Sequence, residues 1–485
     1  MLSWPKSNSR HNMPIVQIDN RRFKYTVAFA NGNGQQFEVN QAAVKHLEID
    51  DNTFVPFHHG MMVLDGSFDA MESSSDGDPL SQYQVRGDAR DYLVVSITPE
   101  YSADNFLAGQ SNTLHKLSFL FAIYKIDDHP GADGAKDKII YFREALGQIL
   151  KEKNANIFSA DIAEAGAISN SSRSVKTGVL MKELLKQVLD IEEDAFGKWD
   201  EGGKSLFFNS VAGSTAEDDL NYIHKLHVSE NGAGDYCILH YGRDGKFTLI
   251  SLAEYFKLQF EDPGSYVTET LVMGGSNSET EGIGNDQVPF ASGPMLPGFA
   301  AIEEFFIANT YGEDYTAIIK SNITSSRNSS LGVHKLNFAD GNMQVVYDEF
   351  KQLYVDPFSD LHGTALDVAT PLNKSVLENN TFKQVQSELP LNYSTAQGRN
   401  KTLLGMMFMS NVIKVKLRGT TYRQASKFYD LKKSSNYNES NFDRKYIGRW
   451  FSTSVKHVFT QTTYENHIEM VKPYYVGVVN NAEAQ

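Results

Sequence analysis

The sequence predicts a mainly β chain with an α/β insertion, on three observations. Side chains alternate with period two near both ends of the chain, between residues 23 and 39 and between 448 and 471. Between these segments, apolar residues at three-to-four spacing are concentrated in residues 138–226, where they indicate helices. The hairpin turn at 242–245 adds a strand pair to these helices, so this part is predicted to be an α/β unit.

Length and composition are those of a globular chain with several domains. At about 100–200 residues per domain, 485 residues correspond to roughly three units. Hydrophobic residues make up 41% and charged residues 22%, which is ordinary for a soluble protein. No apolar run approaches the roughly 20 residues of a membrane helix, and the first residues show no signal-peptide core. We therefore expect no membrane-spanning segment and a protein that is made and kept in a cytoplasm.

The charge balance and the cysteine count argue against a DNA-binding protein and exclude a protein held together by intramolecular disulfides. The 45 basic and 60 acidic residues give a net charge of −15. This argues against a DNA-binding body, because phosphate neutralisation is the main source of nucleic-acid affinity. An acidic protein can still line a channel through which DNA passes. The single cysteine, Cys237, excludes intramolecular disulfides, and its apolar neighbours predict a small core residue.

Residues 1–135 carry mainly strand signals, and we expect them to form the first domain. Alternating apolar residues at 23–29 and 37–39 flank the sequence Asn-Gly-Asn-Gly, a strong hairpin signal. Further extended segments are predicted at 44–49, 57–64, 92–98 and 114–126. The adjacent His58 and His59 are not expected to share a metal ion, because neighbouring side chains of a strand point to opposite faces.

Residues 136–260 form the predicted α/β insertion domain. Apolar spacing predicts helices at 138–153 and 177–190. Ser214 and Thr215, ahead of an acidic first turn that includes Asp218, predict a hydroxyl N-cap at the start of a third helix that ends near residue 226. His224 and His227 lie three residues apart on this helix and could share a metal ion. No third ligand stands at a recognisable spacing, so a packed or solvent-facing role is favoured.

The remaining chain divides into a polar region and a second β region. Residues 261–330 are predicted to be a polar loop or arm region that contains a short helix at 300–309. Residues 331–485 carry strand signals at 333–338, 344–346 and 411–418 and include the hairpin 448–471. Lys414, Lys416 and Arg418 share one face of the 411–418 strand. These cations could contact nucleic acid, but in an acidic protein a solvated or partner-facing surface is favoured.

Three parts of the sequence resemble one protein family. The hairpin carries YIGRWF at 446–451, VKH at 455–457 and YENH at 464–467. With the order of strand signals from 43 to 124 and the helix and hairpin at 215–252, it is similar to central baseplate hub proteins of contractile-tailed bacteriophages. Those proteins are related to the base of type VI secretion spikes. The resemblance implies two tail-tube-like antiparallel β-barrels in one chain, at 1–135 and 331–485.

The resemblance also implies a function. A hub of this family adapts the six-fold tail tube to a three-fold spike around an axial channel, and a homotrimer of two-barrel chains supplies six barrels. The implied partners are the tail tube protein, the central spike protein, neighbouring baseplate wedge proteins, and genomic DNA only in passage. The implied location is the tail baseplate of the virion, after assembly in the host cytoplasm. The side chains expected to contact partners are Lys414, Lys416, Arg418, Trp450, Phe451, Val455 and Phe459.

The alternative function is that of a tail-associated hydrolase acting on cell-wall glycan or peptide. Glycoside hydrolysis needs two carboxylates flanking the scissile bond, and no spacing in this acidic sequence singles out such a pair. The metalloprotease motif H-E-x-x-H and the serine-hydrolase motif G-x-S-x-G are both absent. The sequence therefore favours a structural protein and predicts no catalytic residue, no cofactor and no bound metal.

Overall fold

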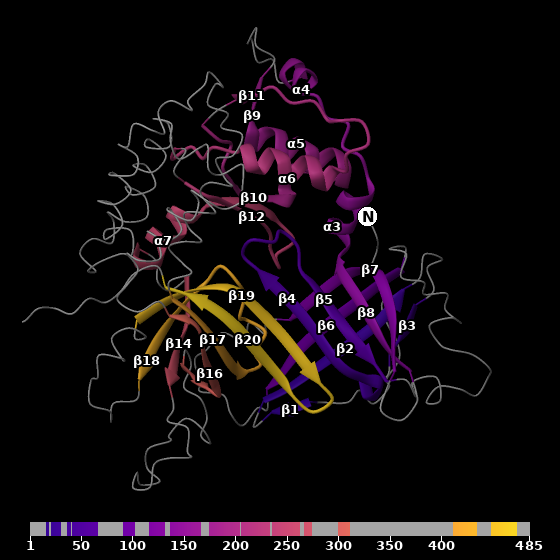
Figure 1. The fold of residues 1–485 in the computed structure, drawn as a ribbon, viewed down its shortest axis with the longest axis vertical. Coiled ribbons are helices and arrows are strands. Elements are labelled where there is room, and N and C mark those ends of the chain that lie inside the picture. Colours follow the sequence, from indigo (N-terminus) through magenta and orange to yellow (C-terminus); the bar gives the residue numbers. More distant parts are fainter. Residues whose placement is uncertain are drawn as a thin grey trace, which may run out of the picture.

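A computed structural model of the chain shows strands in its lower part and a layer of helices above them (Figure 1). It confirms the predicted mainly β class with a large, mostly antiparallel sheet. Among the residues it describes, no helix has the length and hydropathy needed to cross a membrane. The described residues are 16–18, 21–30, 36–39, 41–65, 91–101, 116–130, 136–165, 174–203, 205–232, 235–261, 266–273, 299–310, 411–433 and 448–472.

The N-terminal strands form one side of a sheet that has 15 strands within the described residues. The bounds of these strands are β1 Val16–Ile18, β2 Arg21–Ala30, β3 Gln36–Glu38, β4 Val44–Asn52, β5 His59–Leu64, β6 Asp91–Tyr101, β7 Leu117–Pro130 and β8 Lys136–Glu144. Their order is β1-β2-β6-β7-β8-β5-β4, with β3 beside β2, and these pairs are antiparallel. The hairpin predicted within 23–39 is thus the β2–β3 pair.

This side of the sheet curls around one apolar core. Phe23 and Tyr25 on β2 are buried, and they meet the C-terminal hairpin of β19 (Gly448–Thr460) and β20 (Tyr464–Val471). The ring centroids of Phe23 and Tyr464 lie 4.9 Å apart, and those of Tyr25 and Phe459 lie 5.0 Å apart. In hydrogen-bonded order, five strands separate β2 from β19, namely β6, β7, β8, β5 and β4. The sheet must therefore bend back on itself to bring these rings together.

A second group of strands surrounds another apolar core, and its strands are connected in one series of pairings. Its bounds are β14 Val267–Met273, β15 Phe299–Ile302, β16 Glu304–Thr310, β17 Asn411–Arg418 and β18 Phe428–Lys433, together with β19 and β20. β14 pairs with β18, β18 with β19, β19 with β20, β20 with β17, and β17 with β16. A single residue, Glu303, separates β16 from β15, which pairs with β14. β15 and β16 are joined by the chain at Glu303 and not by strand pairing, and β14 is parallel to both of its partners.

The predicted hairpin at 448–471 belongs to both strand groups. Residues 454–460 of β19 pair with β4 of the N-terminal group, whereas Gly448 to Phe451 pair with β18 of the C-terminal group. Accordingly, Trp450 and Val455 lie in the second core, whereas Phe459 and Tyr464 lie in the first. In Figure 1 this gold hairpin crosses between the indigo strands and the second group. The strands predicted at 448–460 and 464–471 are confirmed with these bounds.

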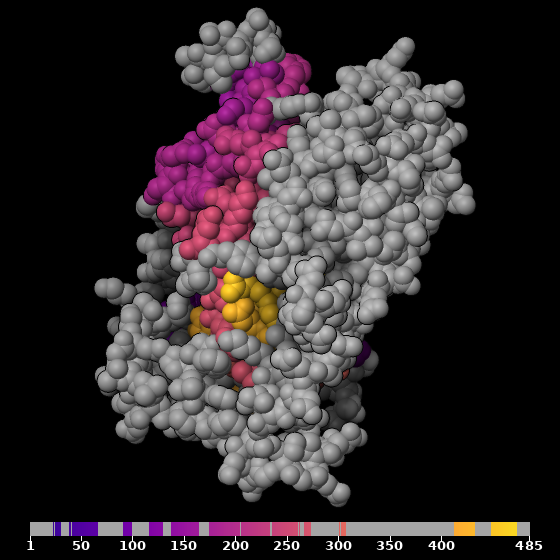
Figure 2. Space-filling model, turned by 90° about the vertical axis from the view of Figure 1, so that its left-hand side faces the viewer, coloured from indigo at the N-terminus to yellow at the C-terminus, as the bar shows by residue number. Residues whose placement is uncertain are grey.

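The insertion packs its helices over a small three-stranded sheet, in the order β10-β13-β12. Its elements are α3 Ala145–Glu152, α4 Ser159–Ala165, β9 Val175–Lys176, α5 Thr177–Leu189, β10 Phe196–Trp199, β11 Ser205–Leu206, α6 Ala216–Leu226, β12 Cys237–Tyr241, β13 Phe247–Ser251 and α7 Leu252–Glu261. The predicted N-terminal signal is confirmed, because Thr215 and Asp218 form a capping box on α6. In the view of Figure 2, the insertion lies above the gold C-terminal strands.

The first part of one predicted helix and the whole of another are wrong, for the same physical reason, whereas residues 145–152 of the first are helical in α3. The first part of the predicted helix 138–153 is the end of β8, where Ile140 and Phe142 are fully buried and alternate with partly exposed residues. The predicted helix 300–309 is instead formed by β15 and β16. In both segments, pairing with neighbouring strands overrides a spacing of apolar residues that suits a helix as well as a strand. The predicted strands 333–338 and 344–346 lie outside the described residues.

Candidate functional site

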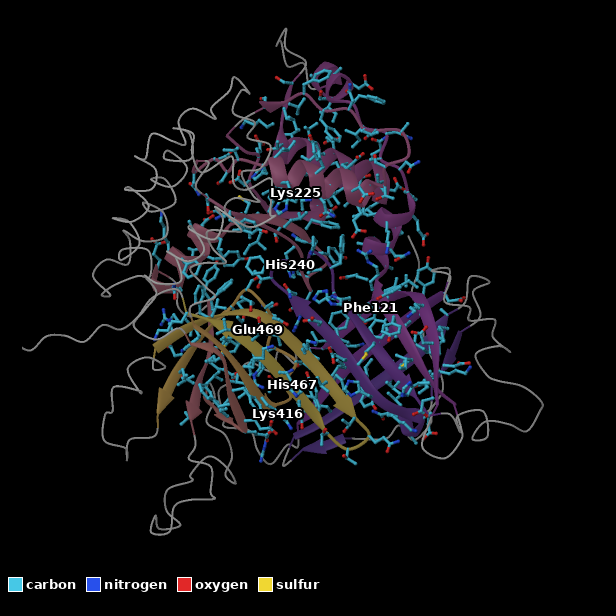
Figure 3. The ribbon with its side chains drawn as sticks, viewed as in Figure 1. Phe121, Lys225, His240, Lys416, His467 and Glu469 are labelled. Carbon is cyan, nitrogen blue, oxygen red and sulfur yellow. The ribbon has the colours of Figure 1, made fainter. Side chains whose placement is uncertain are left out.

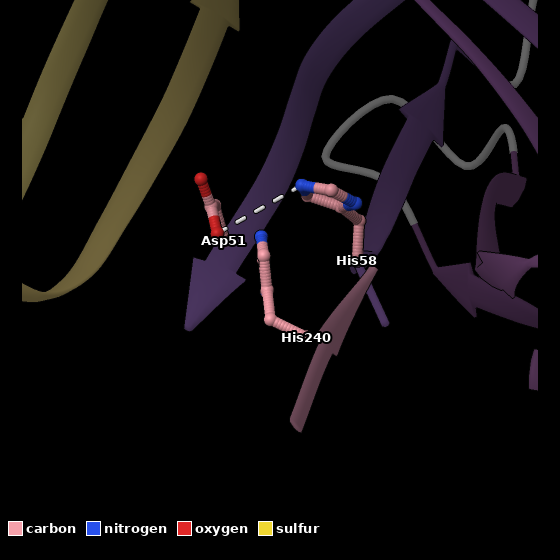
Figure 4. Close-up of side chains that lie close together, drawn as sticks. All are labelled: Asp51, His58 and His240. Carbon is pink, nitrogen blue, oxygen red and sulfur yellow. Dashed lines mark ion pairs between the residues drawn. The ribbon is translucent and has the colours of Figure 1, made fainter. Parts of the chain in front are cut away.

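A buried polar cluster lies where the insertion meets both strand groups (Figure 4). We call Asp51, His58 and His240 the junction cluster. Asp51 comes from β4, His58 from the turn before β5, and His240 from β12 of the insertion. One oxygen of Asp51 and one ring nitrogen of each histidine lie within 4.8 Å of one another. Asp51 and His58 are 1% and 2% exposed, so their charges are held away from water.

The partners of His58 favour its protonated form. Its Nδ1 lies 2.8 Å from Glu144 Oε2, and its Nε2 lies 3.8 Å from Asp51 Oδ1. Burial lowers the pKa of His58, but the hydrogen bond with Glu144 and the charge of Asp51 raise it above its usual value. A protonated His58 between two carboxylates gives a buried ion network in which the charges offset one another.

The other two members of the junction cluster have lowered pKa values. Burial would raise the pKa of Asp51, but His58 and Arg243 lower it to about 2. Burial lowers the pKa of His240 to about 4, so this imidazole is neutral at pH 7. His240 Nδ1 is buried and forms no hydrogen bond with a described residue.

Arg243 connects the junction cluster to the C-terminal strands. Its Nη1 donates to Thr421 O at 2.7 Å, and its Nη2 donates to Arg423 O at 2.6 Å. The same Nη2 lies 3.3 Å from Asp51 Oδ2 and 2.9 Å from His457 Nε2. The hairpin of the insertion thereby binds β4, β19 and the segment between β17 and β18 at one point.

The junction cluster offers metal-ligand atoms but already contains a cation. An aspartate oxygen and two imidazole nitrogens are a donor set that zinc accepts. The Arg243 guanidinium nevertheless lies against the same carboxylate and would repel a metal ion bound there. The geometry therefore favours a structural ion network that fixes the insertion to the sheet.

The histidine pairs singled out from the sequence do not act as pairs. His59 lies 3.5 Å from Asp50 rather than with His58, as expected for neighbours on a strand. His224 Nε2 lies 2.8 Å from the carbonyl oxygen of Cys237, whereas His227 Nδ1 lies 2.9 Å from Thr177 Oγ1. Cys237 is buried, as predicted.

The cationic face of β17 is paired with acidic side chains of the same chain. Lys414 lies 3.1 Å from Glu469, and Arg418 lies 2.9 Å from Glu303. Lys416 lies between two carboxylates, at 3.2 Å from Glu304 and 3.0 Å from Glu465. Figure 3 shows Lys416, His467 and Glu469 close together on these strands. A face of alternating charges does not suit phosphate binding, because carboxylates flank each cation.

The other predicted contact residues point into the chain itself. Trp450, Phe451, Val455 and Phe459 are fully buried in the apolar cores of the chain. Among the residues predicted to contact partners, those on the charged face of β17 are the ones that a partner can reach in a single chain.

Sequence reasoning missed a group of exposed apolar residues on the insertion. Phe158, Phe207, Val211 and Tyr222 are between 42% and 71% exposed. The strand bridge Phe158–Asn209 brings the segments of Phe158 and Phe207 together, and the ring of Phe208, the next residue after Phe207, lies 6.1 Å from that of Tyr222. Gathered exposed apolar side chains often mark a protein contact surface. A sequence signal existed in the apolar run at 206–208, but it predicted no element.

Comparison with known proteins gives structural matches and no sequence match. No protein-family model and no curated protein matches the chain. The chain is similar to a tail protein from Neisseria meningitidis MC58, with 12% identity, a TM-score of 0.39, and coverage of 92% of this chain and 96% of that one. It is also similar to a 43 kDa tail protein of prophage MuSo2 from Shewanella oneidensis, with 8% identity, a TM-score of 0.45, and coverage of 93% and 98%.

A third match is an E. coli component of the type VI secretion system, with 7% identity, a TM-score of 0.36, and coverage of 89% of this chain and 75% of that one. The matched structures are thus two tail proteins, one of them from a prophage, and a type VI secretion component, which is consistent with the resemblance to hub proteins. Because all these TM-scores are below 0.5, we base the functional proposal on the chain's own residues.

Proposed function

We propose that this chain is a structural virion protein, the central hub of a contractile-tail baseplate. Three copies would surround the axial channel and adapt the six-fold tail tube to a three-fold spike. The partners would be the tail tube protein, the spike protein and neighbouring wedge proteins, with DNA only in passage. The net charge of −15 suits such a channel, because it disfavours retention of DNA.

The observation that carries the proposal is the hairpin shared by the two strand groups. β19 pairs with β4 on one side and β18 on the other, and its side chains enter both cores. Two strand groups connected in this way form one rigid unit. With two similar strand groups held rigidly in each chain, three chains would present six such groups to the six-fold tube.

The pairing pattern supports a barrel for each group. The series of strands from β14 through β18, β19, β20, β17 and β16 to β15 supports the second barrel. The contacts of Phe23 and Tyr25 with the hairpin support the first, because they close the curled sheet over its core. We accordingly propose that residues 267–273 and 299–310 belong with the second barrel rather than with a separate arm.

Two surfaces are available for assembly. One is the charged face around Lys414 and Lys416, which can align neighbouring subunits through its alternating charges. The other is the exposed apolar group around Phe207 and Val211 on the insertion. Permanent interfaces usually bury more than about 2,000 Å², so we expect the assembly to survive dilution.

The test is the oligomeric state and symmetry of the purified chain. Light scattering after size-exclusion chromatography should give three times the 54.2 kDa chain mass, and electron microscopy should show a ring of six barrels. Lys414→Glu should weaken the trimer, whereas Lys198→Glu, at another exposed ion pair, serves as the matched control. A monomer at all concentrations, or lysis of cell-wall material by the isolated chain, would overturn the assignment.

A further inference from the structure

A second polar cluster lies inside the insertion, apart from the junction cluster. Asp200 follows β10, His227 ends α6, and Cys237 begins β12. One ligand atom of each, a carboxylate oxygen, a ring nitrogen and the sulfur, lies within 4.8 Å of the others. His227 and Cys237 are fully buried. We call these three residues the insertion cluster.

One nitrogen of His227 is directed into this cluster without a hydrogen bond. Its Nδ1 lies 2.9 Å from Thr177 Oγ1, which fixes the ring. Its Nε2 is buried and makes no hydrogen bond, and the carboxylate oxygen Oδ1 of Asp200 lies 3.4 Å from it. A buried nitrogen that makes no hydrogen bond is costly, so a ligand at this nitrogen would be favourable. An imidazole held at Nδ1 by a neighbour, with Nε2 turned inward, is the arrangement of a metal-binding histidine.

The cluster also concentrates negative charge. Ser229 Oγ lies 2.8 Å from Asp200 Oδ2 and 3.0 Å from Asp235 Oδ2, and a hydroxyl has one proton to donate. Asp200 also accepts from the backbone N–H groups of Gly202 and Glu230, and Asp235 also accepts from Asn231 Nδ2 and Ser251 Oγ, so neutral donors surround both carboxylates. Among the described residues, no lysine or arginine forms an ion pair with Asp200, in contrast to the Arg243 contact of the junction cluster. A bound cation would offset this charge.

We propose that Asp200, His227 and Cys237 bind a divalent transition-metal ion, with zinc the best match. Thiolate, imidazole and carboxylate are the ligands of zinc sites, and bond lengths of 2.0–2.3 Å place tetrahedral ligand atoms about 3.3–3.8 Å apart. Asp200 Oδ1 lies 3.4 Å from His227 Nε2, and the other carboxylate oxygen, Oδ2, lies 3.5 Å from Cys237 Sγ, so each contact is within this range. Binding transfers the thiol proton of Cys237 to solvent, so the affinity rises with pH.

The metal would have a structural role that is independent of the proposed hub function. It would add a direct link between the end of α6, the end of β10 and the start of β12, which β13 and the contact of His224 with the carbonyl of Cys237 already hold together. This proposed metal site revises the expectation that His227 only packs or faces solvent. Its partners at the site are Asp200 and Cys237 rather than His224.

The test uses Co²⁺ as a spectroscopic probe on the full chain, purified with a chelator and a thiol-free reductant. Because Cys237 is the single cysteine in the sequence, any thiolate-to-cobalt charge-transfer band must come from this site. We expect one equivalent of Co²⁺ to give that band together with the intense visible bands of tetrahedral cobalt. One equivalent of Zn²⁺ should remove both and raise the melting temperature.

Variants then assign the ligands. Cys237→Ser should abolish the charge-transfer band, and His227→Gln should weaken Co²⁺ binding at least tenfold. His467→Gln, which changes an exposed histidine on β20, should leave the titration unchanged. The proposal is wrong if wild-type protein gives no thiolate band, a result that needs no folded variant. It is also wrong if Cys237→Ser and His227→Gln retain stoichiometric zinc while His58→Gln loses it, because the metal then occupies the junction cluster.

Discussion

Replacing Arg243 with methionine should destabilise the junction between the insertion and the sheet. Methionine keeps much of the length of the side chain but removes the donors to the carbonyls of Thr421 and Arg423. It also leaves the buried carboxylate of Asp51, which is 1% exposed, without its arginine. The guanidinium is itself mostly buried, at 13% exposure, so solvent screens this interaction only partly.

The expected loss of unfolding free energy is a large fraction of the total stability of a domain. Removing one partner of a buried ion pair typically costs about 3–5 kcal/mol, against a total of about 5–15 kcal/mol for a domain. The double variant Arg243→Met with Asp51→Asn should recover part of this loss, because the carboxylate is then neutral. We expect a coupling energy of about 1–3 kcal/mol between the two positions.

Urea unfolding followed by tryptophan fluorescence measures these free energies, and hydrogen exchange shows where the chain opens. Faster exchange should concentrate near residues 51–58 and 421–426, which the arginine connects. Lys198→Met is the matched control, since its ion pair with Glu254 is exposed and should contribute less than about 1 kcal/mol. If Arg243→Met costs no more than this control, or if the double variant is additive, the junction does not depend on the ion pair.

Three further outcomes are expected. The pKa of His240 is about 4 in the folded chain against about 6.5 unfolded, so its contribution to stability is present above pH 6.5 and is lost as the pH falls towards 4. In this range the free energy of unfolding should change by about 1.4 kcal/mol per pH unit because of His240. Urea unfolding should show a smaller change in His240→Gln and the full change in His467→Gln. Phe459→Ala removes a ring stacked 4.0 Å from Tyr464 and should cost about 3–5 kcal/mol in urea unfolding, and a cost below 1 kcal/mol would contradict the shared hairpin. Phe207→Ser should leave the unfolding free energy within about 0.5 kcal/mol but weaken the trimer in analytical ultracentrifugation, and an unchanged trimer would exclude this surface from the interface.

Local patterns predicted the elements whose signals are strong and unambiguous. The hairpin of β19 and β20, the strand β17 and the helices α5 and α6 follow from alternation, helical spacing and the Thr215 cap. The segments 138–144 and 300–309 failed because their apolar spacing fits two periods, and only pairing with distant strands decides between them.

The buried clusters could not be predicted from spacing. Asp51 and His240 are far apart in sequence and meet only because the insertion packs onto the sheet. Asp200 follows β10, His227 lies at the end of α6 and Cys237 begins β12, so the three residues form no local motif. The same limit applies to Arg243, whose partners lie between β17 and β18.

The shared hairpin also determines when the chain can finish folding. Asp50 and Ser454, hydrogen-bonded across β4 and β19, are 404 residues apart in the sequence. During synthesis, β4 and the aromatic residues of β2 must wait, without their final partners, until the ribosome has made nearly the whole chain. A product that stops before residue 448 would expose both the edge of β4 and the apolar face of β2, which marks it for degradation or aggregation. Chains that lack the hairpin cannot complete the sheet, so truncated copies are not expected to enter an assembly.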